Sequence, residues 1–160
     1  MAMDMFIKIE TIDGEAQDSK HKNEIDVLSW SWGSANHGVS GTGGGSGAGK
    51  VAMQDLSFTH YLDKASPKLA LANWSGRHIP SAVLVMRKAG ENPVEYLKYT
   101  FNDLIVSSVN TGGSGGEDRL VEAVTLNFSK VNMEYVEQDA KGGAKPAISA
   151  GWDVKQNMKA

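Results

Sequence analysis

The sequence contains no cysteine, which excludes disulfides, thiolate zinc sites, iron–sulfur clusters and a cysteine nucleophile. It also contains no long apolar run. The longest extends only from Ala82 to Met86, far short of the ~20 residues that a membrane-spanning helix needs. Lysine and arginine together number 16 against 19 aspartates and glutamates, so the basic excess that nucleic-acid binding requires is missing. These absences predict a soluble protein that binds neither a membrane nor a nucleic acid.

The length and composition predict one folded domain. The chain has 160 residues, of which 41% are hydrophobic and 22% are charged, close to the averages for globular proteins. We therefore expect a single domain over residues 1–160. Near the N-terminus, Asp4 stands where a secretory signal peptide would carry positive charge. If the protein leaves the cell, we expect it to use a route other than the general signal peptide.

Hydrophobic and polar residues alternate along most of the chain, which is the pattern of β-strands. Clusters of glycine, asparagine and aspartate separate the alternating segments, as in antiparallel sandwiches and barrels. The sequence therefore predicts a mainly β fold, an antiparallel β-barrel or sandwich. The expected strands lie within residues 5–10, 27–32, 56–59, 82–87, 96–106, 124–135 and 152–158, with a bend at Asn102-Asp103.

Two strands carry further information. One face of the first tryptophan-containing segment should fill the core, because large aromatic side chains are mostly buried. That face carries Leu28, Trp30 and Trp32, and the opposite face carries Val27, Ser29 and Ser31. In residues 124–135 the alternation changes phase near Ser129-Lys130, which indicates either a β-bulge or a strand buried on both faces.

One short α-helix is predicted among the strands. Ser66 can cap its N-terminus, Pro67 suits the first helical position, and Gly76 can end it in a left-handed conformation. The helix would be about nine residues long, as these start and stop signals indicate.

A glycine-rich segment at residues 33–50 is predicted to be a mobile loop. It contains eight of the 18 glycines and almost no apolar surface, so it cannot offset its own ordering entropy within one chain. Because it interrupts a single domain, an interaction role is the alternative to a plain linker.

Two motifs suggest enzymatic sites, and their context argues against both. Gly44 to Lys50 matches a phosphate-binding loop, but Val51 replaces the Ser or Thr that would hold Mg²⁺, and a strand pattern follows instead of a helix. Gly112 to Gly116 matches a nucleophile elbow, but the last histidine of the chain, His78, precedes it. We therefore expect neither a nucleotide site nor a hydrolase.

The four histidines, His21, His37, His60 and His78, show no ligand spacing to one another or to a carboxylate. We expect no metal, no cofactor and no enzymatic activity. The residual class is a binding or assembly protein.

Several whole segments resemble one family. They are MDMFIKI at 3–9, EIDVLSWSWG at 24–33, GKVAMQDLSFT at 49–59, DKASPKL at 63–69, TGGSGGEDRL at 111–120, VTLNFS at 124–129 and GWDVKQN at 151–157. In this order, over nearly the full length, they are similar to the haemolysin-coregulated protein (Hcp) family of bacterial type VI secretion systems.

The resemblance implies an antiparallel β-barrel or sandwich of two sheets with one short flanking α-helix. It also implies a structural subunit of the type VI inner tube. Such a protein is made in the bacterial cytoplasm, forms a homohexameric ring that stacks into tubes, and is secreted without a signal peptide. Its implied partners are further copies of itself, a spike protein, a contractile sheath and small effector proteins carried in the lumen.

The resemblance also suggests which residues make these contacts. Ser29 and Ser31 would face the lumen. The ring-stacking loop would comprise Gly38, Val39, Gly41, Gly43, Gly44, Gly45, Ser46, Gly47 and Gly49. The residues alone leave a rival open, a carbohydrate-binding β-sandwich whose tryptophans stack on sugars. A nucleotide-binding protein that acts through Lys50 is the third and least favoured interpretation.

Overall fold

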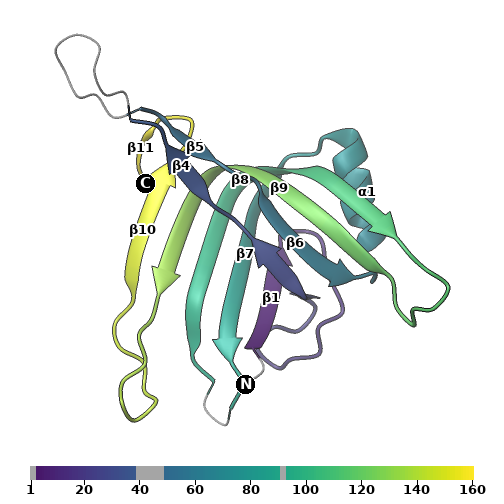
Figure 1. Cartoon of the computed structure of the whole chain (residues 1–160), viewed down its shortest axis with the longest axis horizontal. Helices are drawn as coiled ribbons and strands as arrows, with labels where there is room; N and C mark the ends of the chain where they lie inside the picture. The colour runs from purple at the N-terminus through teal and green to yellow at the C-terminus, as the bar shows by residue number, and fades with distance from the viewer. Residues whose placement is uncertain (1–2, 39–48, 91–92) are drawn as a thin grey trace.

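The structure is a computed structural model that describes residues 3–38, 49–90 and 93–160. Strands dominate these residues, and all strand pairs are antiparallel (Figure 1). The strands are β1 (Met3–Ile9), β2 (Ile25–Asp26), β3 (Ser29–Ser31), β4 (Ser34–Asn36), β5 (Val51–Met53), β6 (Leu56–Tyr61), β7 (Ile79–Lys88), β8 (Glu95–Gly112), β9 (Val121–Tyr135), β10 (Ile148–Asp153) and β11 (Met158–Lys159). The single helix among them is α1 (Ser66–Ser75).

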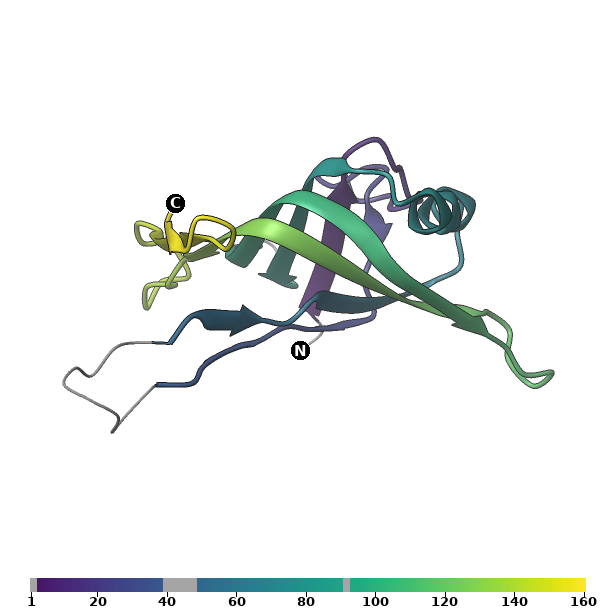
Figure 2. The same ribbon diagram turned by 90° about the horizontal axis from the view of Figure 1, so that it is seen from above.

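The main sheet is built around the two longest strands, β8 and β9, which pair with each other along almost their whole length. On the side away from this pairing, the two strands have different neighbours in their first and second halves. Residues 121–126 of β9 pair with β6, and residues 130–135 pair with β10. Residues 95–104 of β8 pair with β7, which continues the sheet to β1. The β8–β9 ribbon therefore runs through two layers, and Figure 2 shows it arching between them.

One segment joins the two layers on the side away from this ribbon. Strand β2 pairs with β1, and just after it the Val27 N–H makes a further hydrogen bond to β1, donating to the Met5 carbonyl at 3.0 Å. The next N–H, of Leu28, donates to Thr59 of β6 at 2.9 Å, and β3 then pairs with β6. The predicted mainly β, antiparallel sandwich with one flanking helix is confirmed. The sheet curls without closing into a barrel, because β2 and β11 stand at the two ends of its strand order.

The crossing between layers overturns one predicted face. Val27 is buried, whereas Leu28 is 41% exposed, the reverse of the predicted alternation. Trp30 and Trp32 do pack against the core as predicted. The alternation fails at Leu28 because the strand pairing passes from β1 to β6 between residues 27 and 28, and the chain turns there.

The core lies between the two layers. Its largest fully buried side chains come from both long strands and from the strands beside them, as expected when the buried face of each strand takes every second residue. They include Ile7, Phe58, Leu84, Phe101, Leu104 and Leu126. An aromatic cluster extends this core, because Trp32 lies edge-on to Tyr99 at 5.4 Å and to Phe101 at 6.2 Å between ring centroids.

The phase change near Ser129-Lys130 comes from burial on both faces, and the β-bulge alternative is wrong at this position. Phe128 and Ser129 are both buried, and the pairing with β8 continues without an extra residue. The irregularity in register lies in β8 instead, between Val106 and Ser108. Here β9 passes from one layer to the other, so both of its faces are covered. The predicted bend is confirmed at Asp103, which has a positive φ of 52°.

The helix α1 differs from its prediction only at its start. Ala65 occupies the N-cap position, and the Ser66 hydroxyl instead accepts a hydrogen bond from the Asp63 N–H at 3.1 Å. At the other end Gly76 is left-handed, with φ of 64°, as predicted. Within the described residues, no helix has the length and apolar character needed to cross a bilayer.

An ionic cluster fixes the N-terminal loop against β7. The guanidinium of Arg87, only 7% exposed, donates to both oxygens of the Asp18 carboxylate, one of them at 3.0 Å. It also donates to Asp4 at 3.3 Å and lies over the Phe6 ring. Asp18 thus links the loop ionically to β7.

The acid sensitivity of this contact is testable. Hydrogen bonding from Arg87 lowers the pKa of Asp18 to about 2 from its ordinary 3.8. Because the folded-state pKa is depressed, the contact stabilises the fold fully above about pH 4 and is lost as pH falls toward 2. We expect Asp18→Asn to be less stable than wild type at pH 7 and to lose less stability between pH 4 and 2. Urea unfolding measures both, with Asp13→Asn as control. Parallel pH profiles for wild type and Asp18→Asn would contradict the assignment.

Candidate functional site

One face of the molecule carries small polar side chains in register across four strands. Its first row is Ser31, Ser57, Thr125 and Ser108, which pair successively from β3 through β6 and β9 to β8. Its second row is Ser29, Thr59, Ala123 and Asn110. We call these eight residues the hydroxyl face. It forms because each of these strands directs alternate residues into the core and the others outward.

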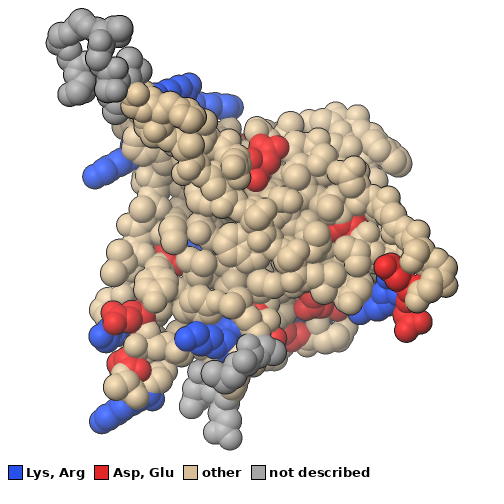
Figure 3. All heavy atoms as spheres, in the orientation of Figure 1, with Lys and Arg blue, Asp and Glu red and all other residues tan. Residues whose placement is uncertain are grey.

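Hydrogen bonds hold these hydroxyl groups to one another. Ser29 Oγ lies 2.6 Å from Thr59 Oγ1, and Ser108 Oγ lies 2.6 Å from Thr125 Oγ1. At the margin, the Asp55 carboxylate accepts hydrogen bonds from Ser107 at 2.7 Å and from Asn127 at 2.8 Å. The hydroxyl face therefore presents polar groups that are already partly satisfied. Figure 3 views the molecule from the side of β3 and β6, and charged side chains gather mainly at the margins of that face.

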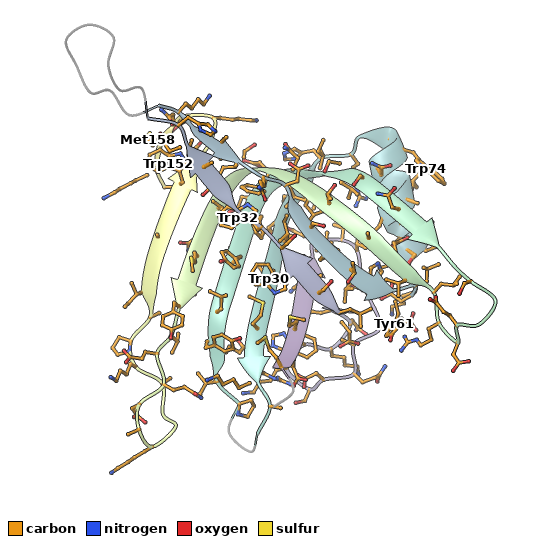
Figure 4. All side chains as sticks on the ribbon, in the orientation of Figure 1. Trp30, Trp32, Tyr61, Trp74, Trp152 and Met158 are labelled. Carbon is orange, nitrogen blue, oxygen red and sulfur yellow. The ribbon has the colours of Figure 1, made fainter. Side chains whose placement is uncertain are left out.

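The structure places both predicted lumen residues on this face. Ser29 and Ser31 are exposed, on the side of β3 opposite Trp30 and Trp32, whose positions Figure 4 shows. The predicted alternation is confirmed for these four residues. The lumen role itself stays a prediction.

A buried polar pair lies directly behind the hydroxyl face. His60 is fully buried and its Nε2 lies 2.8 Å from Oε1 of Glu122, its cross-strand partner, which is 2% exposed. His60 Nδ1 lies 3.8 Å from the Asp63 carboxylate, and burial raises the pKa of Asp63. Because both pair members sit on core-facing positions of β6 and β9, the pair links these two strands from the inside.

Sequence reasoning missed these histidine partners. It treated the histidines as isolated, whereas His21 also lies between Glu24 and Glu95, at 2.9 and 2.6 Å, and stacks on Phe6. A signal for His60 was present, because the alternation of β6 places it on the same face as Phe58. In the part of the chain that the structure describes, no group of three or more His, Asp or Glu side chains could hold a metal ion.

The predicted loop at 33–50 is partly a strand pair. Within it, Ser34–Asn36 forms β4, which pairs with β5 as a separate two-stranded ribbon, so the loop prediction is wrong for these three residues. The ribbon extends away from the main sheet (Figures 1 and 2). Of the predicted stacking loop, Gly38 and Gly49 are described, and the Asn36 side chain donates to the Gly49 carbonyl at 2.7 Å. Val39, Gly41, Gly43, Gly44, Gly45, Ser46 and Gly47 lie outside the described residues.

The two enzyme-like motifs sit in the contexts that the sequence predicts. A strand, β5, begins at Val51 directly after Lys50, where a phosphate-binding loop would open a helix. Gly112 ends β8, and Gly113 to Gly116 lie in the connection to β9, so a strand follows where a nucleophile elbow needs a helix. In both cases the described residues that follow the motif form a strand and not the helix that its chemistry requires.

Comparison with known proteins points to one family. Residues 6–135 match the family model described as type VI secretion system effector, Hcp. The whole chain is 55% identical to Protein hcp1 of Pseudomonas aeruginosa, over the full length of both. It is 47% identical to Hcp1 of Salmonella typhimurium, with a TM-score of 0.80 and complete coverage of both chains. A solved structure described as a type six secretion system protein has a TM-score of 0.92 at 36% identity, covering 99% of this chain and 100% of that one.

The pair behind the hydroxyl face gives a testable stability prediction. Glu122→Leu leaves His60 buried without its partner, so we expect the free energy of unfolding to fall by about 3 kcal/mol. His60→Leu combined with Glu122→Leu should recover part of this loss, because no polar group then remains unpaired. Urea unfolding of both single variants and the double variant measures the coupling. Strictly additive losses would show that the two residues do not interact.

Proposed function

The chain belongs to the Hcp family of type VI secretion proteins, and from that premise we propose that it is the structural subunit of the system's inner tube. Six copies form a closed ring, rings stack into the tube, and small effector proteins travel in the lumen. A spike protein at the tip and a contractile sheath around the tube are its other partners. It is made in the cytoplasm, leaves the cell with the tube without a signal peptide, and catalyses no reaction.

The edges of the hydroxyl face support ring formation. Among the described strands, β3 pairs only with β6, and residues 107–112 of β8 pair only with β9. Such edges present backbone N–H and C=O groups to another chain. When the β3 edge of one copy meets the β8 edge of the next, the contact is heterologous and can close into a ring. The hydroxyl face would then be continuous around the inside.

The chemistry of the hydroxyl face supports transport of cargo. A passage for different proteins must wet easily and bind weakly, and rows of Ser, Thr, Ala and Asn do both. Their hydroxyl groups already bond to one another, so a passing protein gains little from each contact. No member of either row carries a charge that would hold one cargo and repel another.

The β4–β5 ribbon supports the stacking assignment. The ribbon extends away from the main sheet, as Figure 2 shows, and Gly38 and Gly49 lie in the segment that joins its two strands. A second ring placed above or below the first would meet such a projection before it meets the sheet. We therefore assign ring stacking to the segment from Gly38 to Gly49.

The observation that carries the proposal is the family match over the full chain, together with an uncharged face bounded by two strand edges. Its first test is mass. Six copies of a 17.1 kDa chain weigh about 103 kDa, and we expect light scattering of the purified protein at micromolar concentration to give that mass. A monomeric mass would contradict the ring.

The lumen assignment is tested by adding charge to the hydroxyl face. Ser31→Asp with Ser57→Asp places carboxylates on the first row, and we expect a co-expressed effector to bind at least about tenfold more weakly, through repulsion or lost contact. Light scattering should still give the mass of the wild-type assembly. Ser149→Asp, on the exposed part of β10, is the matched control and should leave effector binding unchanged. Equal binding by all three proteins would rule out this face as the cargo surface.

A further inference from the structure

The outward side of α1 exposes two large apolar residues that the fold does not use. Leu71 is 62% exposed and Trp74 is 78% exposed, and their spacing of three places them next to each other on the helix. The inward side of α1 is also apolar, with Leu69 and Ala72 buried in the core. Solvent-facing positions of a helix normally carry polar or charged side chains, so an adjacent exposed Leu and Trp are typical of an interaction surface. The outward pair therefore indicates a partner that covers it.

The surroundings of this pair are cationic. Lys68 is the one charged residue of α1, and Arg77 follows just beyond the Gly76 cap. A shallow hollow of about 380 Å³ beside the helix is lined by Thr11, Lys68, Leu71, Ala72, Ser75 and Arg77. Arg77 donates to the Thr11 hydroxyl at 2.9 Å. Neither Lys68 nor Arg77 forms an ion pair with a carboxylate among the described residues.

The helix lies across the core from the hydroxyl face. It packs against β8, where the Asn73 side chain donates to the Val106 carbonyl at 2.9 Å. Figure 4 shows Trp74 pointing away from the sheet, and Figure 2 shows α1 on the side of the molecule opposite β3 and β6.

We infer that Lys68, Leu71, Trp74 and Arg77 form a docking site, the α1 site, for a different protein whose surface combines carboxylates with exposed apolar side chains. Tryptophan is a frequent anchor of protein interfaces because it buries a large area with few rotatable bonds. The two cations would pair with carboxylates around that anchor and exclude basic partners. An anionic membrane is disfavoured, since surface binding of that kind uses clusters of roughly 4–8 basic residues.

This inference goes beyond the proposed tube function and does not require it. The four residues of the α1 site belong to one chain, whereas the ring depends on the backbone edges of β3 and β8. If the ring forms as proposed, α1 faces outward from it. One set of measurements can therefore test peptide binding to the α1 site and assembly of the ring independently.

The test uses the full-length protein and a labelled synthetic peptide in which glutamates flank leucines. We expect saturable binding by fluorescence anisotropy, and a matched peptide with lysine in place of glutamate should not bind. Trp74→Ala should weaken binding at least about tenfold, and Lys68→Glu with Arg77→Glu should do the same. Ile148→Ser is the control, because Ile148 is 70% exposed on strand β10 and not on α1. This variant should bind like wild type.

Four results would overturn the inference. They are no saturable binding of the acidic peptide, equal binding of the basic peptide, the same loss in Ile148→Ser, and Trp74-dependent binding to phosphatidylserine vesicles. Light scattering of the same samples supplies a further one, because a lower mass in Trp74→Ala would show that a second copy covers the helix. A monomeric wild type that still binds the acidic peptide would contradict the ring and support the α1 site.

Discussion

The pairing of β8 with β9 is the interaction on which the rest of the structure depends. Because β9 pairs with β6 through residues 121–126 and with β10 through residues 130–135, one strand belongs to both layers of the sandwich. At the crossover Phe128 and Ser129 are both buried. Beyond the crossover, one face of such a strand packs on the core and the other face is exposed to solvent. The hydroxyl face exists on the first half of β9 because no second layer covers its outer side.

The inner and outer sides of the layer that contains β3, β6 and the first half of β9 therefore meet different physical requirements. The inner side must bury apolar area and satisfy any polar group that it holds, which is why His60 and Glu122 bond to each other at 2.8 Å. The outer side must stay wet, and it consists of small hydroxyl and amide side chains. Since these residues alternate along the same strands, a one-residue slip in register would expose Phe58 and bury Ser57. The buried pair opposes such a slip, because it requires residue 60 to lie opposite residue 122.

The sequence predicted the β-rich fold well because alternation depends only on local burial. It predicted the faces of Trp30, Trp32, Ser29 and Ser31 for the same reason. It was wrong at Leu28, where the chain changes its hydrogen-bonding partner from β1 to β6, because period-two alternation holds only while a strand keeps the same neighbours. The partner of His60 could not be identified, since Glu122 is 62 residues away and only the register of β6 against β9 brings them together.

The sequence also does not predict which face of α1 is buried. Its residues are apolar on both sides, so the sequence alone gives no reason to bury Leu69 rather than Leu71. Packing against β8 decides it, because Asn73 bonds to Val106 and turns Leu69 inward. Leu71 and Trp74 are then exposed beside Lys68 and Arg77. The close-packed core separates this surface from the uncharged hydroxyl face. Close packing resists local deformation, so the core holds these two surfaces at a fixed separation, and a partner on one side need not disturb the other.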